Sequence, residues 1–173
     1  MKRFILLLTV MLVTFSTQAQ GFYSFFSFNE DEETFLTTWV DPTFDDGGFQ
    51  VGIDITKELE CGWVRIGVSH YEYLNPSYTD IVGSGGVNFH LFYTDVIKYS
   101  LGSRLGVEFR EGNPFAIIGF VGGFEVKITD VIRVGFDVWK DYRASQDPSK
   151  YGAKGESQWV DNGSIRLIFR IND

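Results

Sequence analysis

The sequence has almost no cysteine, little proline and no long apolar segment beyond its first residues. Its single cysteine, Cys61, excludes an internal disulfide. The four prolines leave room for uninterrupted strands, because proline removes a ladder hydrogen bond in the middle of a sheet. No later stretch reaches the roughly 20 apolar residues of a transmembrane helix. If this chain meets a membrane, it does not do so by a helix.

Basic residues are scarce as well, and two of them lie at the amino terminus. Lys2 and Arg3 precede an apolar run from Phe4 to Val13, and Thr17-Gln18-Ala19 offers small residues for cleavage. This pattern predicts a cleavable signal helix over residues 1–19 and a single exported domain over residues 20–173. Removal of the two cations leaves 13 basic against 23 acidic residues, a net charge of minus ten. That balance disfavours nucleic-acid binding.

Glycine and aromatic residues are plentiful, and they occur in alternating patterns. In the stretch Tyr99 to Arg110, apolar side chains share one parity, whereas glycine and charged residues share the other. The stretch Val131 to Arg143 repeats this arrangement. Because successive side chains of a strand point to opposite faces, both stretches predict strands with one apolar face and one charged face.

The same alternation predicts eight strands and no helix after the signal peptide. We place them at Gln20–Asn29, 49–56, Trp63–Tyr73, Ile81–Tyr93, Tyr99–Arg110, Phe115–Lys127, Val131–Arg143 and Trp159–Ile171. The acidic run Glu30 to Asp46 is predicted as a solvated loop, although Thr34 to Val40 within it could also extend a strand. Hairpin connections favour a closed antiparallel up-and-down barrel, an all-β fold, because closure removes the exposed edges.

Alternation alone does not say which face of the barrel is inside, but glycine placement does. Seven glycines lie on the charged parity: Gly52, Gly67, Gly102, Gly106, Gly119, Gly123 and Gly135. A narrow lumen needs small residues beside long charged ones, so we predict an interior network of ion pairs and an apolar face in lipid. The predicted network comprises Asp54, Arg65, Arg104, Glu108, Arg110, Glu125, Lys127, Arg133, Asp137, Asp141, Arg166 and Arg170.

Aromatic residues near the strand ends also favour lipid on the outside. We predict two interfacial girdles, one with Trp63, Tyr93 and Tyr99, the other with Tyr71, Tyr73, Tyr78, Phe115, Trp139, Tyr142 and Trp159. The alternative is a soluble periplasmic lipocalin-like barrel, which would hold an apolar ligand in its lumen.

At this length and with these strands, the chain resembles the small OmpA/OmpX-type outer-membrane barrels. The cleavage context Thr17-Gln18-Ala19-Gln20 resembles that of exported Bacteroidetes proteins. The resemblance implies a monomer in outer-membrane lipid that acts in envelope integrity or surface interaction. The predicted ion pairs of the interior indicate a lumen that does not conduct. Contacts with surface partners would be made by the loops at 30–48 and 144–157.

Some barrels of this kind modify lipid A, so a lipid A-modifying enzyme is the less favoured alternative, and polar clusters near the strand ends are its candidate catalytic groups. Ser69, His70 and Glu72 form the compact trio of the sequence. A carboxylate-oriented histidine can activate a serine, but Ser69 and His70 point to opposite faces of a strand. We therefore expect a protein that is not an enzyme and uses no metal or cofactor.

Overall fold

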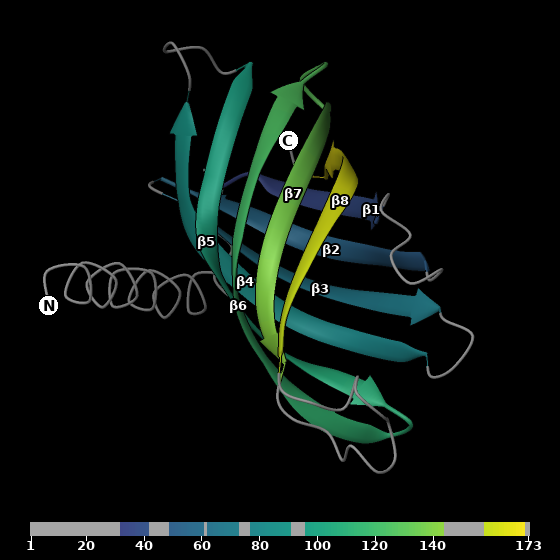
Figure 1. The fold of residues 1–173 in the computed structure, drawn as a ribbon. Helices are drawn as coiled ribbons and strands as arrows, with labels where there is room; N and C mark the ends of the chain where they lie inside the picture. Colours follow the sequence, from purple (N-terminus) through teal and green to yellow (C-terminus); the bar gives the residue numbers. More distant parts are fainter. Residues whose placement is uncertain are drawn as a thin grey trace, which may run out of the picture.

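Eight antiparallel strands close into a barrel in the computed structural model of the chain (Figure 1). The structure describes residues 32–41, 49–60, 62–72, 77–90, 96–143 and 158–171. The strands are β1 (Thr34–Val40), β2 (Phe49–Leu59), β3 (Gly62–Glu72), β4 (Tyr78–His90), β5 (Ile97–Arg110), β6 (Asn113–Lys127), β7 (Ile132–Arg143) and β8 (Gln158–Arg170). The predicted closed up-and-down barrel of eight strands is confirmed. Within the described residues, no helix has the length and apolar character needed to cross a membrane.

The register of the strands fixes the shape of the barrel. A row of paired residues that starts at Arg170 of β8 and passes through Phe35 of β1 returns to β8 at Val160, ten residues away. Such a stagger in a closed sheet means that the strands tilt against the barrel axis. Strands β2 to β8 have 11 to 15 residues, and about 9–11 residues of a tilted strand cross the apolar core of a bilayer.

The two ends of the barrel differ in their connections. At what we call the turn end, β1 begins, β8 ends and the connections 60–61, 91–96 and 128–131 lie. At the loop end lie the connections 41–48, 73–77, 111–112 and 144–157. Most residues of the two longest connections, 41–48 and 144–157, and the predicted signal peptide lie outside the described residues.

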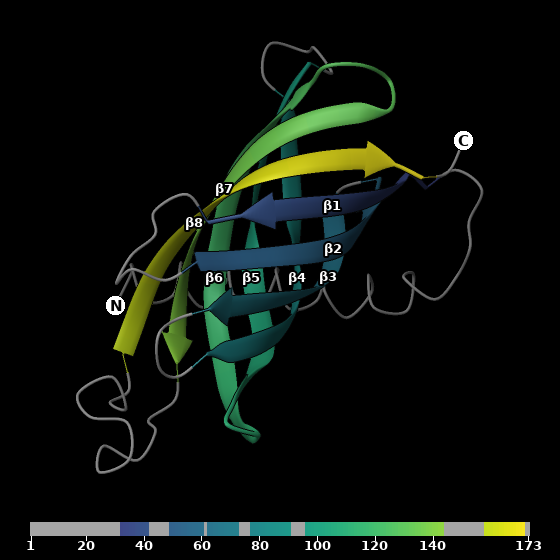
Figure 2. The ribbon, with the colours of Figure 1, turned by 90° about the vertical axis from the view of Figure 1, so that its right-hand side faces the viewer.

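The first strand is not where the sequence pattern placed it. Thr34–Val40 forms β1 and pairs with both β2 and β8, so it closes the barrel (Figure 2). The prediction of a solvated loop over this stretch was wrong, and the alternative of a strand at Thr34 to Val40 is confirmed. The predicted strand Gln20–Asn29 lies outside the described residues. The stretch was misread because acidic residues flank it and threonine occurs on both of its faces. Its inward side chains Phe35 and Thr37 are nevertheless fully buried.

The two faces of the barrel have opposite character. Charged and small polar side chains point inward and are buried, whereas apolar side chains on the outer face are exposed, many by 40–50%. The exposed apolar set includes Val51, Ile53, Ile55, Ile66, Val68, Ile81, Leu101, Leu105, Ile118, Val134, Val138, Ile165 and Leu167. An apolar surface of this extent is the pattern of a barrel that lies in lipid rather than in water.

Glycines on the inner face make room for the carboxylates of the neighbouring strand. Gly67 pairs in register with Asp54, Gly123 with Asp137, Gly119 with Asp141 and Gly135 with Glu125. A Cβ atom added to Gly67, Gly119 or Gly123 would overlap the carboxylate of its partner. The interior therefore holds long charged side chains only because each of these carboxylates has a glycine beside it.

Candidate functional site

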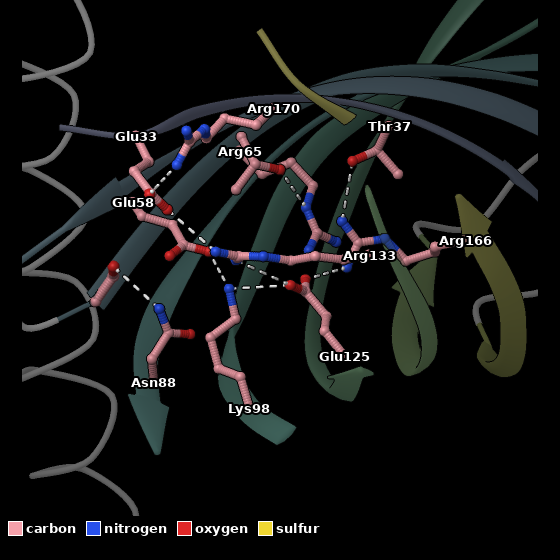
Figure 3. A network of polar contacts seen from close by, with 12 residues as sticks. Glu33, Thr37, Glu58, Arg65, Asn88, Lys98, Glu125, Arg133, Arg166 and Arg170 are labelled. Carbon is pink, nitrogen blue, oxygen red and sulfur yellow. Dashed lines mark hydrogen bonds and ion pairs between the residues drawn. The ribbon is translucent and has the colours of Figure 1, made fainter. Parts of the chain in front are cut away.

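A cluster of four buried charges lies in the barrel interior, and we call it the central cluster; Figure 3 shows three of its members, Arg65, Glu125 and Arg166. It consists of Arg65, Glu125, Asp137 and Arg166, each at most 6% exposed. The Nη1 group of Arg166 donates to Glu125 Oε1 at 3.0 Å and to Asp137 Oδ1 at 3.3 Å. Nη1 of Arg65 donates to the other oxygen of Asp137 at 2.6 Å. Two arginines thus share one carboxylate, an arrangement that the planar guanidinium group favours.

Two threonines accept further hydrogen bonds from the central arginines. Arg166 Nη2 donates to Thr37 Oγ1 at 3.3 Å, and Arg65 Nε donates to Thr56 Oγ1 at 3.2 Å. Because a buried charge is tolerated only when it is paired and hydrogen-bonded, these contacts let the guanidinium groups stay inside the barrel. They also explain why β1 carries threonine on its inner face.

A second group of charges lies toward the turn end, and we call it the turn-end cluster: Glu33, Glu58, Lys98, Arg133 and Arg170 (Figure 3). Arg133 donates to Glu58 at 2.6 Å and to Glu33 at 3.1 Å. Arg170 also donates to Glu33, at 2.9 Å. Lys98 pairs with Glu58 and, at 2.9 Å, with Glu125, so the turn-end cluster and the central cluster form one continuous network.

Further ion pairs lie toward the loop end. Arg104 Nε lies 3.2 Å from Asp141 Oδ1, and Arg110 Nη2 lies 2.9 Å from Glu108 Oε1. Both carboxylates are almost completely buried. The guanidinium of Arg110 also stacks over the ring of Tyr78, 5.1 Å from its centroid. Charge pairs therefore occupy the interior along its whole length.

Aromatic rings fill the space between these pairs. Trp63, Trp139 and Val121 form a buried apolar core inside the barrel, against which Trp39 packs. Arg104 stacks on Trp139 and Arg65 on Trp63, at 4.6 and 4.7 Å from the ring centroids, an attractive cation–π geometry. The rings thus link the arginines of the central region to one another.

The placement of Trp63 and Trp139 in interfacial girdles was therefore wrong. Trp63 shares the parity of Arg65, and Trp139 shares that of Asp137, so strict alternation already pointed both inward. Tyr99, Tyr142 and Trp159, by contrast, are exposed on the outer face near strand ends. Parity along the strand predicted whether these side chains point inward or outward better than position near a strand end did.

The structure places all twelve predicted network residues on the inward parity. Asp54 is buried in register with Gly67. Lys127, the last residue of β6, is partly exposed and pairs with Asp130 in the following turn at 2.7 Å. The hydrogen bond and the charge of Lys127 lower the pKa of Asp130 below its ordinary value. Ten of the twelve form an ion pair within the central cluster, with the turn-end cluster or in the loop-end pairs; among the described residues, Asp54 and Lys127 do not.

Sequence reasoning missed Glu33, Glu58 and Lys98. Glu33 was assigned to the acidic loop, and the other two lie at strand ends near predicted turns. Parity could have found both, because Lys98 shares the face of Arg104, and Glu58 shares that of Asp54. Glu33 could be found only after β1 was recognised.

The trio Ser69, His70 and Glu72 does not assemble around the serine. Ser69 is buried on the inner face and accepts a hydrogen bond from Gln50 Nε2 at 3.1 Å. His70 lies on the outer face, where its ring nitrogens contact Glu72 Oε2 and Thr79 Oγ1, both at 3.0 Å. The opposite orientation expected from alternation is present, so the histidine does not reach the serine hydroxyl.

Comparisons of the whole chain with known proteins agree with this architecture. No family model and no curated protein matches the sequence. The crystal structure of Neisserial surface protein A is similar at a TM-score of 0.55 and 12% identity, over 82% of this chain and 96% of that one. A de novo designed transmembrane β-barrel is similar at a TM-score of 0.52 and 10% identity, over 80% and 95%. The fold is that of the small transmembrane β-barrels. This barrel has its buried charged residues inside and presents apolar residues outside, which is the arrangement that contact with lipid requires.

Proposed function

We propose that the chain is an outer-membrane β-barrel with a closed lumen, which anchors its loops at the surface and does not conduct ions. The exposed apolar face supports membrane insertion, because it would be costly in water. The interior supports closure, since ion pairs and tryptophan rings occupy it from the turn end to the loop end. Export through the secretory pathway follows from the predicted signal peptide.

The size of the central cavity carries the proposal of a closed lumen. The space beside Trp39, Arg65 and Trp139 measures about 20 Å³, which is room for one water molecule. A hydrated ion cannot pass such a point unless the arginine pairs open. The polar interior also argues against the soluble carrier, which would need an apolar lumen to hold an apolar ligand.

Electrical recording tests the closed lumen. Purified barrel inserted into a planar lipid bilayer should give no conductance steps, whereas an open porin of known conductance in the same bilayer should give them. The control for the sensitivity of the recording is a variant in which alanine replaces both Trp39 and Trp139. This variant lacks two rings that pack together in the interior, and it keeps the ion pairs of the central cluster. Reproducible steps from the unaltered protein would refute a closed lumen.

The loops at 41–48 and 144–157 are the proposed contact surfaces for envelope or extracellular partners. Both follow odd-numbered strands, so both lie at the loop end, and a periplasmic amino terminus would place that end outside. An epitope tag inserted after Ser149 should therefore be labelled by antibody on intact cells. A tag inserted after Thr129, in a turn-end connection, should be labelled only after permeabilisation. The reverse pattern would mean that the loop end faces the periplasm.

A further inference from the structure

An ion pair interrupts the apolar outer face between β7 and β8. Lys140 Nζ lies 2.9 and 3.0 Å from the two carboxylate oxygens of Asp161, and both side chains are more than half exposed. Two residues further toward the loop end, Tyr142 and Trp159 pack edge to face on the same surface, with centroids 5.5 Å apart. Along the strands, the pair is therefore nearer to the middle of the barrel than these exposed aromatic residues. It lies within the face that we assign to lipid.

An apolar groove of about 580 Å³ adjoins this pair on the side of the turn end. Its floor contains Gly122 of β6 and Gly163 of β8, which alternate in one register row with Leu101 and Val138. Phe136 borders the groove. Neither glycine has a neighbour within 3.4 Å of an added Cβ atom, so the groove is open rather than filled by the chain itself.

Lipid tails can cover the groove but cannot satisfy the ion pair. A charged side chain in contact with hydrocarbon is costly and is normally directed toward a partner. The lysine ammonium has three donors, and the carboxylate has about four acceptor sites, so the single pair leaves hydrogen-bonding capacity on both groups. An occupant of this surface should therefore present an anion opposite Lys140 and a cation opposite Asp161.

We propose that the occupant is a second copy of this chain. Given the membrane placement proposed above, two copies insert in the same direction, and a two-fold axis between them lies parallel to the membrane normal. The two-fold rotation places Lys140 of each copy opposite Asp161 of the other copy. Each charge of one ion pair therefore faces the opposite charge of the second pair. Glycines at the contact allow close approach of the two sheets. The result is a ring of four alternating charges above an apolar contact, a dimer in place of the monomer expected from sequence.

A second groove on the barrel provides the comparison. It measures about 350 Å³ and is bordered on the outer face by Ile66, Gly83, Leu105 and Val107. Its outward side chains are apolar, so lipid tails can cover this groove completely. Charge complementarity singles out the β6–β8 groove, and substitutions at Gly83 serve as matched controls for those at Gly163.

Reversal of single charges tests the dimer. Donor- and acceptor-labelled copies in lipid vesicles should show energy transfer that Lys140→Asp and Asp161→Lys each reduce, with the dissociation constant raised about tenfold or more. A mixture of the two variants should recover the transfer, because each supplies the charge that the other lacks. The doubly exchanged variant K140D/D161K should also associate with itself. Gly163→Phe should weaken association, and Gly83→Phe should not.

Each other result would overturn the proposal. Wild-type protein that stays monomeric at every protein-to-lipid ratio would do so, as would single variants that associate as well as the wild type. Mass spectrometry that finds a zwitterionic lipid held by Lys140 and Asp161, without a dimer, would make lipid the occupant instead. Heat-modifiable migration and partition into vesicles, measured on every variant, separate loss of association from loss of folding or of membrane insertion.

Discussion

Replacing Arg166 with alanine should lower the free energy of unfolding by about 3–5 kcal/mol, the usual cost of breaking a buried ion pair from one side. Arg166 is 1% exposed and contacts Glu125, Asp137 and Thr37. Its removal leaves two carboxylates close together with fewer cations between them, and the space beside Asp137 measures only about 20 Å³. The loss should therefore exceed that from any surface pair of this chain.

Urea unfolding in lipid vesicles, followed by tryptophan fluorescence and by heat-modifiable migration, measures this change. Lys127→Ala is the matched control, because it removes a cation from a partly exposed pair with Asp130, for which about 0–1 kcal/mol is expected. Equal losses for the two variants would mean that water reaches the central cluster and that the interior is open.

Much of this network was predictable, because the membership of the inner face depends on parity alone. The glycines beside Asp54, Asp137 and Asp141 and the charges themselves follow a period of two that survives in a single sequence. The barrel of eight strands followed from the same period and from short connections. Those signals are local, and each can be read without knowledge of the other strands.

The pairing within the network could not be predicted, because it depends on register. Arg65 and Asp137 are 72 residues apart, and they meet only because the barrel closes with a particular stagger. A shift of one strand by two residues would keep every face but exchange the partners. The same limit explains the misplaced first strand, since β1 is recognisable chiefly by what it pairs with. Its inward Thr37 acquires a purpose only when Arg166 is known to lie beside it.

Replacing Ile53 with arginine should test the membrane placement more directly than any change inside the barrel. Ile53 lies midway along β2, is 49% exposed and points outward between Thr38 and Val68. In a lipid-embedded barrel, Ile53→Arg should reduce the free energy of unfolding by about 2–4 kcal/mol, because the charge lies near the middle of the bilayer. In a soluble barrel the same surface change should fall within about 0.5 kcal/mol.

The matched control is Phe49→Arg, on the same strand and the same face but at the loop end. The cost of an arginine falls to about 0–1 kcal/mol near the membrane interface, so lipid predicts a large difference between the two positions. Water predicts almost none, since both sites are similarly exposed. Urea titrations of folding into vesicles measure both values under one condition. A barrel that tolerates arginine equally at 49 and 53 does not have its outer face in hydrocarbon, and the ion pair of Lys140 and Asp161 would then need no partner.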